Sequence, residues 1–222
     1  ANRVESYKFG TVGQAVTGNT IKLAEDNELL VRGTGVFSGY LHSTANSPLD
    51  SDGFLHSGDY AEIDSEGFIK VTGRKSEVFK TSTGRKIAPA GIEGIIQKAT
   101  NVNQVLIIGK DQKYLIALIT YIKHKAFIND KKNEEISKLA TDVSSCLIGQ
   151  PNYKCPVGII ISYNQFSLIN NELTSNLKLK RNNILHNYSE TIHKLYQELD
   201  DSESQIHQEP IQLDNQLILL KL

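Results

Sequence analysis

The sequence predicts an α+β chain in which a small β-barrel or twisted β-sheet precedes a second domain with a small antiparallel sheet and flanking helices. Short β-rich runs separated by turn-forming residues fill the chain as far as Arg74. Beyond Arg74, apolar strand-like runs alternate with segments whose apolar residues have helical spacing. The composition, with 39% hydrophobic and 22% charged residues among 222, is that of an ordinary folded protein.

The first part reads as a series of short strands. Residues 8–24 mix β-branched residues with glycines, and 28–32 form an apolar run closed by Gly33. Residues 46–53 are rich in turn formers, and residues 64–67 end in glycine, which predicts a hairpin loop. The further strands expected here are 36–41, 54–56, 60–63 and 68–71.

The second part combines helices with strands. Pro89 near the start of an amphipathic run predicts a helix over 89–99. Apolar residues at helical spacing predict two more helices, over 133–148 and 179–199. The expected strands are 104–108, 115–122 and 157–163. We expect an antiparallel sheet with the helices on one face, and a domain boundary near Lys75 and Ser76.

Charge, cysteine content and hydropathy exclude several classes of protein. A formal net charge of −1 gives no broad electrostatic reason to bind nucleic acid. No apolar run approaches the ~20 residues of a membrane span. Cys146 and Cys155 form no metal-ligand pattern and are expected in the core, in a reducing compartment.

The two ends of the chain carry their own expectations. Residues 197–216 hold six Asp or Glu and no Lys or Arg, which predicts a solvated, weakly ordered acidic tail. The apolar residues 217–220 after it either dock on the domain or lead into further sequence. Because the chain has no methionine and begins with Ala1, we expect a processed chain or a piece of a longer protein.

A first pair of candidate site residues is Asp59, in the segment His56-Ser57-Gly58-Asp59, and Arg74. An ionised carboxylate only accepts hydrogen bonds, so Asp59 suits the two hydroxyls of a ribose, although Ser-Gly-Asp is also an ordinary turn. The predicted hairpin between them would bring Arg74 back toward Asp59. Such a pair is either a surface ion pair of little energetic value or part of a ribose or phosphate clamp.

Two basic segments are further candidates. The loop from Lys80 to Pro89 contains hydroxyls, a glycine and further cations, so it is either a solvated turn or a site for a phosphorylated ligand. Lys178, Lys180 and Arg181 lie just before the last predicted helix. Three cations at a helix N-terminus oppose the helix dipole, which suggests that one of them serves a ligand.

The order and spacing of these segments resemble one known family. Asp52-Gly-Phe-Leu-His-Ser-Gly-Asp59 through Gly73-Arg74 resembles the ribose-binding segment of adenylate-forming acyl-CoA synthetases, whose superfamily includes luciferases and peptide-synthetase adenylation domains. The segment 79–93 is most similar to the long-chain fatty acid branch, and 173–181 is similar to its C-terminal lysine motif. Residues 9–16 and 28–40 are similar to earlier motifs, so the resemblance spans about 9–196.

The resemblance implies a domain division and nucleotide contacts. Residues 1–74 would be the C-terminal β subdomain of the large AMP-binding domain, 75–199 the mobile C-terminal lid domain, and 200–222 the acidic tail. Asp59 would accept hydrogen bonds from the ribose hydroxyls of the adenylate, with Arg74 beside it. Val71 would pack near the nucleotide.

The resemblance also implies roles in two half-reactions. Lys178 would place its ammonium between the fatty carboxylate and the α-phosphate, where charge develops during adenylation. Rotation at a hinge formed by Lys75 and Ser76 would then replace it with the loop that contains Lys80, which would face the adenylate. That CoA and thioester loop comprises Thr81, Ser82, Thr83 and Gly84. The family usually has Asp or Lys where Ser76 stands, and this difference bears on the hinge.

The implied function is that of a long-chain fatty acid–CoA ligase, in which fatty acid, ATP and CoA give acyl-CoA, AMP and pyrophosphate. The implied cofactors are ATP or AMP, CoA and Mg²⁺. The phosphate loop, the Mg²⁺ ligands and the acyl pocket belong to an N-terminal domain absent from this sequence. This chain should therefore hold no metal and be inactive alone, with that N-terminal domain as its partner in cis.

Two alternatives remain open at this point. The acyl group could pass to a carrier protein, as in a fatty acyl-AMP ligase, or the chain could be a non-catalytic interaction module on the same scaffold. The expected location is cytoplasmic, with membrane association of the parent protein left open. No nucleic-acid partner is expected.

Overall fold

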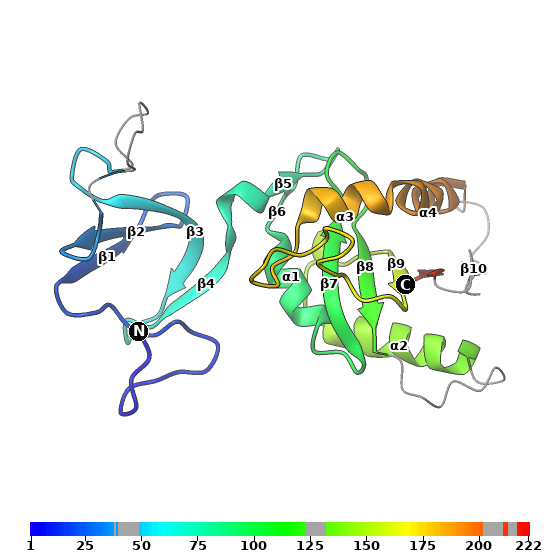
Figure 1. Cartoon of the computed structure of the whole chain (residues 1–222), viewed down its shortest axis with the longest axis horizontal. Coiled ribbons are helices and arrows are strands. Elements are labelled where there is room, and N and C mark those ends of the chain that lie inside the picture. Colours follow the sequence, from blue (N-terminus) through cyan, green and yellow to red (C-terminus); the bar gives the residue numbers. More distant parts are fainter. Residues whose placement is uncertain (38, 40–48, 123–131, 202–210, 213–216) are drawn as a thin grey trace. The chain divides into compact units, whose positions relative to one another are not determined.

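The computed structural model describes residues 1–37, 39, 49–122, 132–201, 211–212 and 217–222. The chain divides into two compact units, Ala1–Val78 and Phe79–Leu222. Each unit has its own sheet and its own buried core. The labelled α-helices all belong to the second unit (Figure 1).

The first unit is built on a four-stranded antiparallel sheet in the order β1-β2-β3-β4. The runs expected at 54–56 and 60–63 are the two ends of one strand, β3. Among the described residues the sheet is open and forms no closed barrel, because β1 and β4 are its edges. Val36 and Phe37 lie outside any strand, and most of the expected strand at 36–41 falls outside the described residues. The bounds are β1 Asn19–Leu23, β2 Glu28–Gly33, β3 Leu55–Ile63 and β4 Ile69–Arg74.

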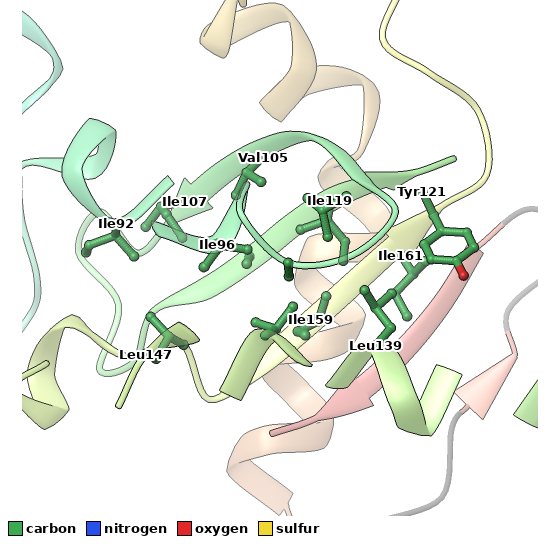
Figure 2. Close-up of a cluster of buried hydrophobic side chains, with 14 of the residues drawn as sticks. Ile92, Ile96, Val105, Ile107, Ile119, Tyr121, Leu139, Leu147, Ile159 and Ile161 are labelled. Atoms are coloured by element: carbon green, nitrogen blue, oxygen red, sulfur yellow. The ribbon is translucent and has the colours of Figure 1, made fainter. Parts of the chain in front are cut away.

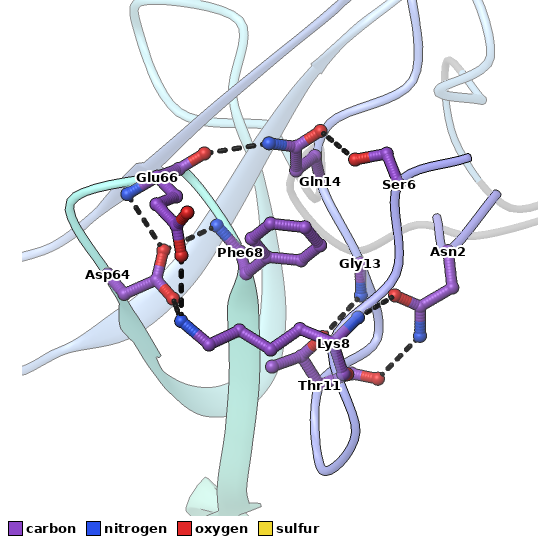
Figure 3. A network of polar contacts seen from close by, with 9 residues as sticks. All are labelled: Asn2, Ser6, Lys8, Thr11, Gly13, Gln14, Asp64, Glu66 and Phe68. Atoms are coloured by element: carbon purple, nitrogen blue, oxygen red, sulfur yellow. Dashed lines mark hydrogen bonds and ion pairs between the residues drawn. The ribbon is translucent and has the colours of Figure 1, made fainter. Parts of the chain in front are cut away.

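The segment before β1 is fastened to the hairpin that joins β3 to β4 (Figure 3). The Lys8 ammonium lies 2.6 Å from a carboxylate oxygen of Asp64 and 3.0 Å from one of Glu66. The other Asp64 oxygen accepts hydrogen bonds from the backbone N–H groups of Glu66 and Phe68. Gly67 has a φ of 81°, in the left-handed region that glycine favours. The hairpin loop expected at 64–67 is thus confirmed.

The second unit is built on a five-stranded sheet in the order β10-β11-β9-β8-β7, with a separate two-stranded hairpin of β5 and β6. The other neighbours of the expected antiparallel sheet run antiparallel, but β8 and β9 run parallel, so the sheet is mixed. Parallel neighbours need a long crossover connection, and the segment between these strands contains helix α2. The bounds are β5 Phe79–Lys80, β6 Lys86–Ile87, β7 Val102–Ile108, β8 Ile116–Tyr121, β9 Gly158–Ser162, β10 Ile211–Gln212 and β11 Leu217–Lys221.

Helices cover both faces of this sheet, so the expectation that they lie on one face was wrong. Helices α1 (Pro89–Ile96) and α2 (Lys132–Cys146) pack in one buried cluster with residues of β7, β8 and β9, as Figure 2 shows. Helices α3 (Arg181–Asn187) and α4 (Ser189–Asp201) pack in a second cluster with the alternate residues of the same strands. Every residue of β8 and β9 is buried, as expected for strands covered on both sides.

The single helix expected over 179–199 is divided at Tyr188. The backbone at Tyr188, with φ −105° and ψ 13°, leaves α-helical geometry between α3 and α4. Its ring packs edge-on against Phe166 with 6.0 Å between centroids, and its hydroxyl lies 3.4 Å from that of Ser162. Tertiary contacts of one aromatic side chain therefore accompany a break that helical periodicity does not reveal.

The last residues of the chain add a strand to the sheet. Strand β11 pairs antiparallel with β9 along its whole length, and β10 pairs with β11. The apolar segment 217–220 thus docks on the second unit, while most of the acidic tail falls outside the described residues. None of the helices described combines the length and the apolarity needed to cross a membrane.

Candidate functional site

The structure places Asp59 beside Arg74. The two residues are partners across β3 and β4, and the Arg74 Nε atom lies 2.8 Å from Asp59 Oδ1. The Asp59 side chain is 22% exposed and that of Arg74 is 53% exposed. Within the described residues the guanidinium occupies one carboxylate oxygen and leaves Oδ2 for another donor. Val71, on β4, is also exposed.

A bulge in β3 sets the position of Asp59. Leu30 pairs with His56 and Glu28 with Tyr60, so the single residue Leu29 of β2 faces the segment 57–59. Gly58 adopts a φ of 71°, which glycine accepts without steric cost. Its N–H, released from the ladder, donates to Glu28 Oε1 at 3.0 Å.

The buried carboxylate of Glu28 is a site residue that sequence reasoning missed. Its second oxygen lies 2.9 Å from His56 Nδ1 and 2.8 Å from Lys75 Nζ. Burial alone would raise the pKa of Glu28, but hydrogen bonds from Lys75, His56 and Gly58 outweigh it, so the pKa is lowered. A Glu at the start of an apolar strand was the available signal, but its partners lie far away in the sequence.

Lys75 and Ser76, the expected hinge, begin a 3₁₀-helix over Lys75–Glu77. The Lys75 ammonium lies 2.7 Å from Asp26 Oδ2 as well as 2.8 Å from Glu28 Oε2. These hydrogen bonds raise the pKa of Lys75 and keep the ammonium charged. Ser76 is exposed, and Val78 after the helix is extended.

The loop after Lys80 is a tight hairpin between β5 and β6. The buried Thr81 hydroxyl lies 2.9 Å from that of Thr83 and accepts from the Arg85 N–H at 3.1 Å. Gly84, with φ 79°, donates its N–H to the Thr81 carbonyl at 2.9 Å. The Ser82 N–H is bound to the Gln112 carbonyl at 3.0 Å. The loop therefore has a defined backbone, while the Lys80 side chain is exposed.

A small cavity of about 70 Å³ lies against this loop. Its lining includes the hydroxyl-bearing side chains of Thr81 and Thr83 and the cations Arg85 and Lys113. The Arg85 guanidinium lies 5.2 Å from the ring centroid of Tyr153, another lining residue. Hydroxyl donors and cations together suit an anionic oxygen ligand.

Lys178 lies at the base of a second tight hairpin. The Thr174 N–H donates to the Lys178 carbonyl at 2.8 Å, and the Lys178 N–H donates to Thr174 Oγ1 at 3.1 Å. Leu177 at the turn has φ 59° and is 67% exposed. A non-glycine residue in this region costs roughly 1–2 kcal/mol relative to a right-handed conformation.

The three cations of this segment, Lys178, Lys180 and Arg181, differ in their hydrogen-bond and ion-pair partners. Lys180 donates to the side-chain oxygen of Asn171, and Arg181 forms a bidentate pair with Glu93. The Lys178 side chain is exposed and makes no hydrogen bond or ion pair with the residues that the structure describes. Lys178 is therefore the cation of this group with charge available to a ligand.

The pair of Glu93 and Arg181 is the second feature that sequence reasoning missed. Arg181 Nη1 and Nη2 lie 2.7 and 2.6 Å from the two oxygens of Glu93, whose Oε1 also accepts from the Ile107 N–H at 2.8 Å. The pair joins α1 to the first turn of α3, three residues after Lys178. A Glu within the apolar run 92–96 was the only local sign of it.

Residues 77–200 match the family model of the AMP-binding enzyme C-terminal domain. The chain belongs to this family. It is 32% identical over 214 residues to the long-chain-fatty-acid–CoA ligase FadD15 of Mycobacterium tuberculosis, covering 88% of this chain and 35% of the relative. It is 29% identical over 219 residues to human long-chain-fatty-acid–CoA ligase 1, covering 86% of this chain and 31% of that enzyme. The chain thus spans about a third of these relatives, in their C-terminal part.

Solved structures of adenylate-forming enzymes share the fold of this family member. The AMP complex of the A-PCP didomain of carboxylic acid reductase from Segniliparus rugosus matches with a TM-score of 0.69 and 21% identity, over 87% of this chain and 29% of that one. The AMP complex of O-succinylbenzoate coenzyme A synthetase from Bacillus subtilis matches with a TM-score of 0.59 and 21% identity, over 79% and 35% of the two chains.

In this AMP-binding family member the expected site residues fall on both units. Asp59, Arg74, Val71, Lys75 and Ser76 belong to Ala1–Val78, whereas Lys80 and Lys178 belong to Phe79–Leu222. The structure brings Asp59 and Arg74 into contact and holds Lys75 on Glu28. In the part of the chain that is described, no cluster of three or more His, Cys, Asp or Glu residues could hold a metal ion.

Proposed function

We propose that this chain is the C-terminal portion of an ATP-dependent long-chain fatty acid–CoA ligase, which forms acyl-CoA, AMP and pyrophosphate through an acyl-adenylate. The observation that carries the proposal is the exposed Lys178 ammonium on a tight hairpin of a chain from the AMP-binding family. The similarity to long-chain-fatty-acid–CoA ligases supports the choice of substrate class.

On this proposal, residues 1–74 complete the large AMP-binding domain, and 75–199 form the mobile C-terminal domain. Asp59 Oδ2 accepts hydrogen bonds from the ribose hydroxyls, while the Arg74 guanidinium fixes the carboxylate through Oδ1. Val71, exposed on the same strand as Arg74, contacts the nucleotide. The arrangement fits AMP because one carboxylate oxygen is held and the other is left for the ligand.

Lys178 and Lys80 then serve successive half-reactions. The Lys178 ammonium stabilises the negative charge that develops between the fatty carboxylate and the α-phosphate. Rotation at the hinge of Lys75 and Ser76 replaces it with the hairpin that carries Lys80, whose backbone around Gly84 lets the pantetheine arm of CoA pass close by. The cations beside Thr81 and Thr83 favour the phosphates of CoA.

The remaining parts of the machinery lie in an N-terminal domain that joins this chain in cis. That domain supplies the acyl pocket, the ATP phosphate loop and the Mg²⁺ ligands, so the isolated chain is inactive. We place the parent protein in the cytoplasm. Formation of acyl-CoA by the isolated chain would contradict this division of tasks.

A carrier-protein acceptor is the second candidate, because the structural neighbours include an A-PCP didomain. Supplying CoA and a carrier protein separately to the full-length protein, and measuring acyl transfer to each, distinguishes the two acceptors. A non-catalytic module is a third candidate. Isothermal titration of the full-length protein with a non-hydrolysable acyl-adenylate analogue would give no heat for such a module.

The proposal is tested by Lys178→Ala in the full-length protein. The rate of adenylation, measured as pyrophosphate release, should fall by more than about 100-fold, because a preorganised charge at the transition state is removed. Thioester formation from supplied acyl-adenylate should be retained. Lys180→Ala is the matched control, since Lys180 is engaged by Asn171. Equal loss in both half-reactions with Lys178→Ala would refute the assignment.

A further inference from the structure

A single buried carboxylate joins two segments that have separate tasks in the proposed function. Glu28 begins β2, and its side chain is only 4% exposed. One oxygen accepts the Gly58 N–H, and the other contacts His56 and Lys75. Burying an ionised carboxylate is costly unless it is paired and hydrogen-bonded, so these contacts make its burial tolerable.

The first arm of this network reaches the bulge that carries Asp59. Since the segment 57–59 leaves the ladder between β2 and β3, its amides need other acceptors. Glu28 Oε1 satisfies Gly58 at 3.0 Å, and the Ser57 hydroxyl satisfies Asp59 at 3.1 Å. The Glu28 carboxylate therefore fixes the backbone position of Gly58, the residue directly before Asp59.

The second arm reaches Lys75, the first residue of the expected hinge. Lys75 directly follows Arg74, the partner of Asp59, and its ammonium bridges Asp26 and Glu28 at 2.7 and 2.8 Å. The backbone is thus anchored to the first unit through Lys75. Exposed Ser76 is the next residue, and the Val78 N–H closes the turn on the Lys75 carbonyl at 3.3 Å.

Resting on the proposed function, we infer that Glu28 is a positioning residue that fixes Asp59 for the nucleotide and anchors Lys75 at the start of the expected hinge. Glu28 does not touch the substrate. It acts through Gly58 on one side and through Lys75 on the other. Loss of the Glu28 charge should therefore weaken nucleotide binding more than it slows the chemical step.

The test compares Glu28→Gln with Glu62→Gln in the full-length protein. Glu62 is an exposed carboxylate on the same hairpin, 3.5 Å from Lys70, and lies outside the network. The measurements are the hydrogen-exchange rates of the Gly58 and Val78 amides, and KM for ATP and kcat in adenylation; the Val78 N–H donates to the Lys75 carbonyl. Glu28→Gln should raise the Gly58 exchange rate and KM for ATP at least about tenfold, with a smaller change in kcat, because a charge-assisted hydrogen bond is weakened. Glu62→Gln should change each value by less than about twofold.

Unchanged exchange at Gly58 in Glu28→Gln would overturn the inference, as would faster exchange with an unchanged KM for ATP. If the full-length protein makes no acyl-adenylate, the proposed function fails, but the exchange measurements still decide whether Glu28 holds the bulge. Should Glu28→Gln not fold, Lys75→Gln tests the second arm alone. Faster exchange at Val78 with protected β2 and β3 amides supports the anchor, and unchanged exchange at Val78 refutes it.

Discussion

Replacing Arg181 by methionine should destabilise the second unit severely, because it leaves the Glu93 carboxylate without its counter-charge. The side chains of Glu93 and Arg181 are 11% and 19% exposed, and both guanidinium nitrogens that face Glu93 are within 2.7 Å of its oxygens. Breaking a buried pair by removing one partner costs ~3–5 kcal/mol. Since Arg181 keeps some exposure, we expect about 3 kcal/mol, or roughly 10 °C in Tm for a unit of this size.

Circular dichroism at 222 nm is a selective assay for this change, because the described α-helices all belong to Phe79–Leu222. Urea titrations would compare Arg181→Met with Lys178→Met, which removes an exposed cation from the same segment and should cost less than about 0.5 kcal/mol. The single variant Glu93→Gln and the double variant Glu93→Gln/Arg181→Met complete a double-mutant cycle. Its coupling energy should be about 2 kcal/mol, because the introduced amide oxygen still accepts from Ile107 and no buried charge remains. Equal costs for the two methionine variants, or zero coupling, would refute the reasoning.

Two further predictions concern the hairpin turn and the buried carboxylate. Leu177→Gly should raise the stability of the second unit by about 0.5–1 kcal/mol in the same titrations. Leu177 has a φ of 59°, which glycine adopts at lower cost, and its side chain is exposed. A loss of stability would show that the Leu177 side chain makes stabilising contacts. The folded-state pKa of Glu28 lies below its ordinary value of 4.5, so its stabilising contribution is complete above that value and is lost as pH falls through the lower folded pKa. Amide protection in β2 and β3 should therefore fall on acidification below about pH 4.5, and less so in Glu28→Gln; equal acid sensitivity of the two proteins would contradict this.

Local pattern was sufficient to locate most elements but not their arrangement. The predicted helix over 133–148 and strand over 104–108 match α2 and β7 to within two residues at each end, because apolar periodicity reports which face of an element is buried. The same periodicity does not say which strands become neighbours. The parallel pair of β8 and β9 and the break at Tyr188 depend on contacts between distant segments, so they could not be read from either segment alone.

The candidate site shows the same difference between contacts within one hairpin, which the sequence can predict, and contacts between distant segments, which it cannot. Asp59 and Arg74 could be paired in advance because one short hairpin connects them. Glu93 and Arg181 are 88 residues apart in the sequence, and Glu28 is 47 residues from Lys75. Their pairing is a property of the folded chain, and no local motif distinguishes these carboxylates from exposed ones.

The partners of the basic residues give a physical reason for the proposed division of tasks. Arg74, Lys75, Lys180 and Arg181 each have a carboxylate or carbonyl acceptor within the chain. The exposed Lys80 and Lys178 have none among the residues described, and both belong to the second unit. A charge that serves a ligand in only one of two half-reactions must be unengaged in the other, since an internal ion pair would compete with the ligand at every turnover. The engaged cations are therefore expected to determine stability, and the two exposed lysines to determine rate. Methionine replacements at Lys80 and Lys178 should separate the two effects by lowering turnover of the full-length protein while leaving its unfolding transition within about 0.5 kcal/mol of the unmodified protein.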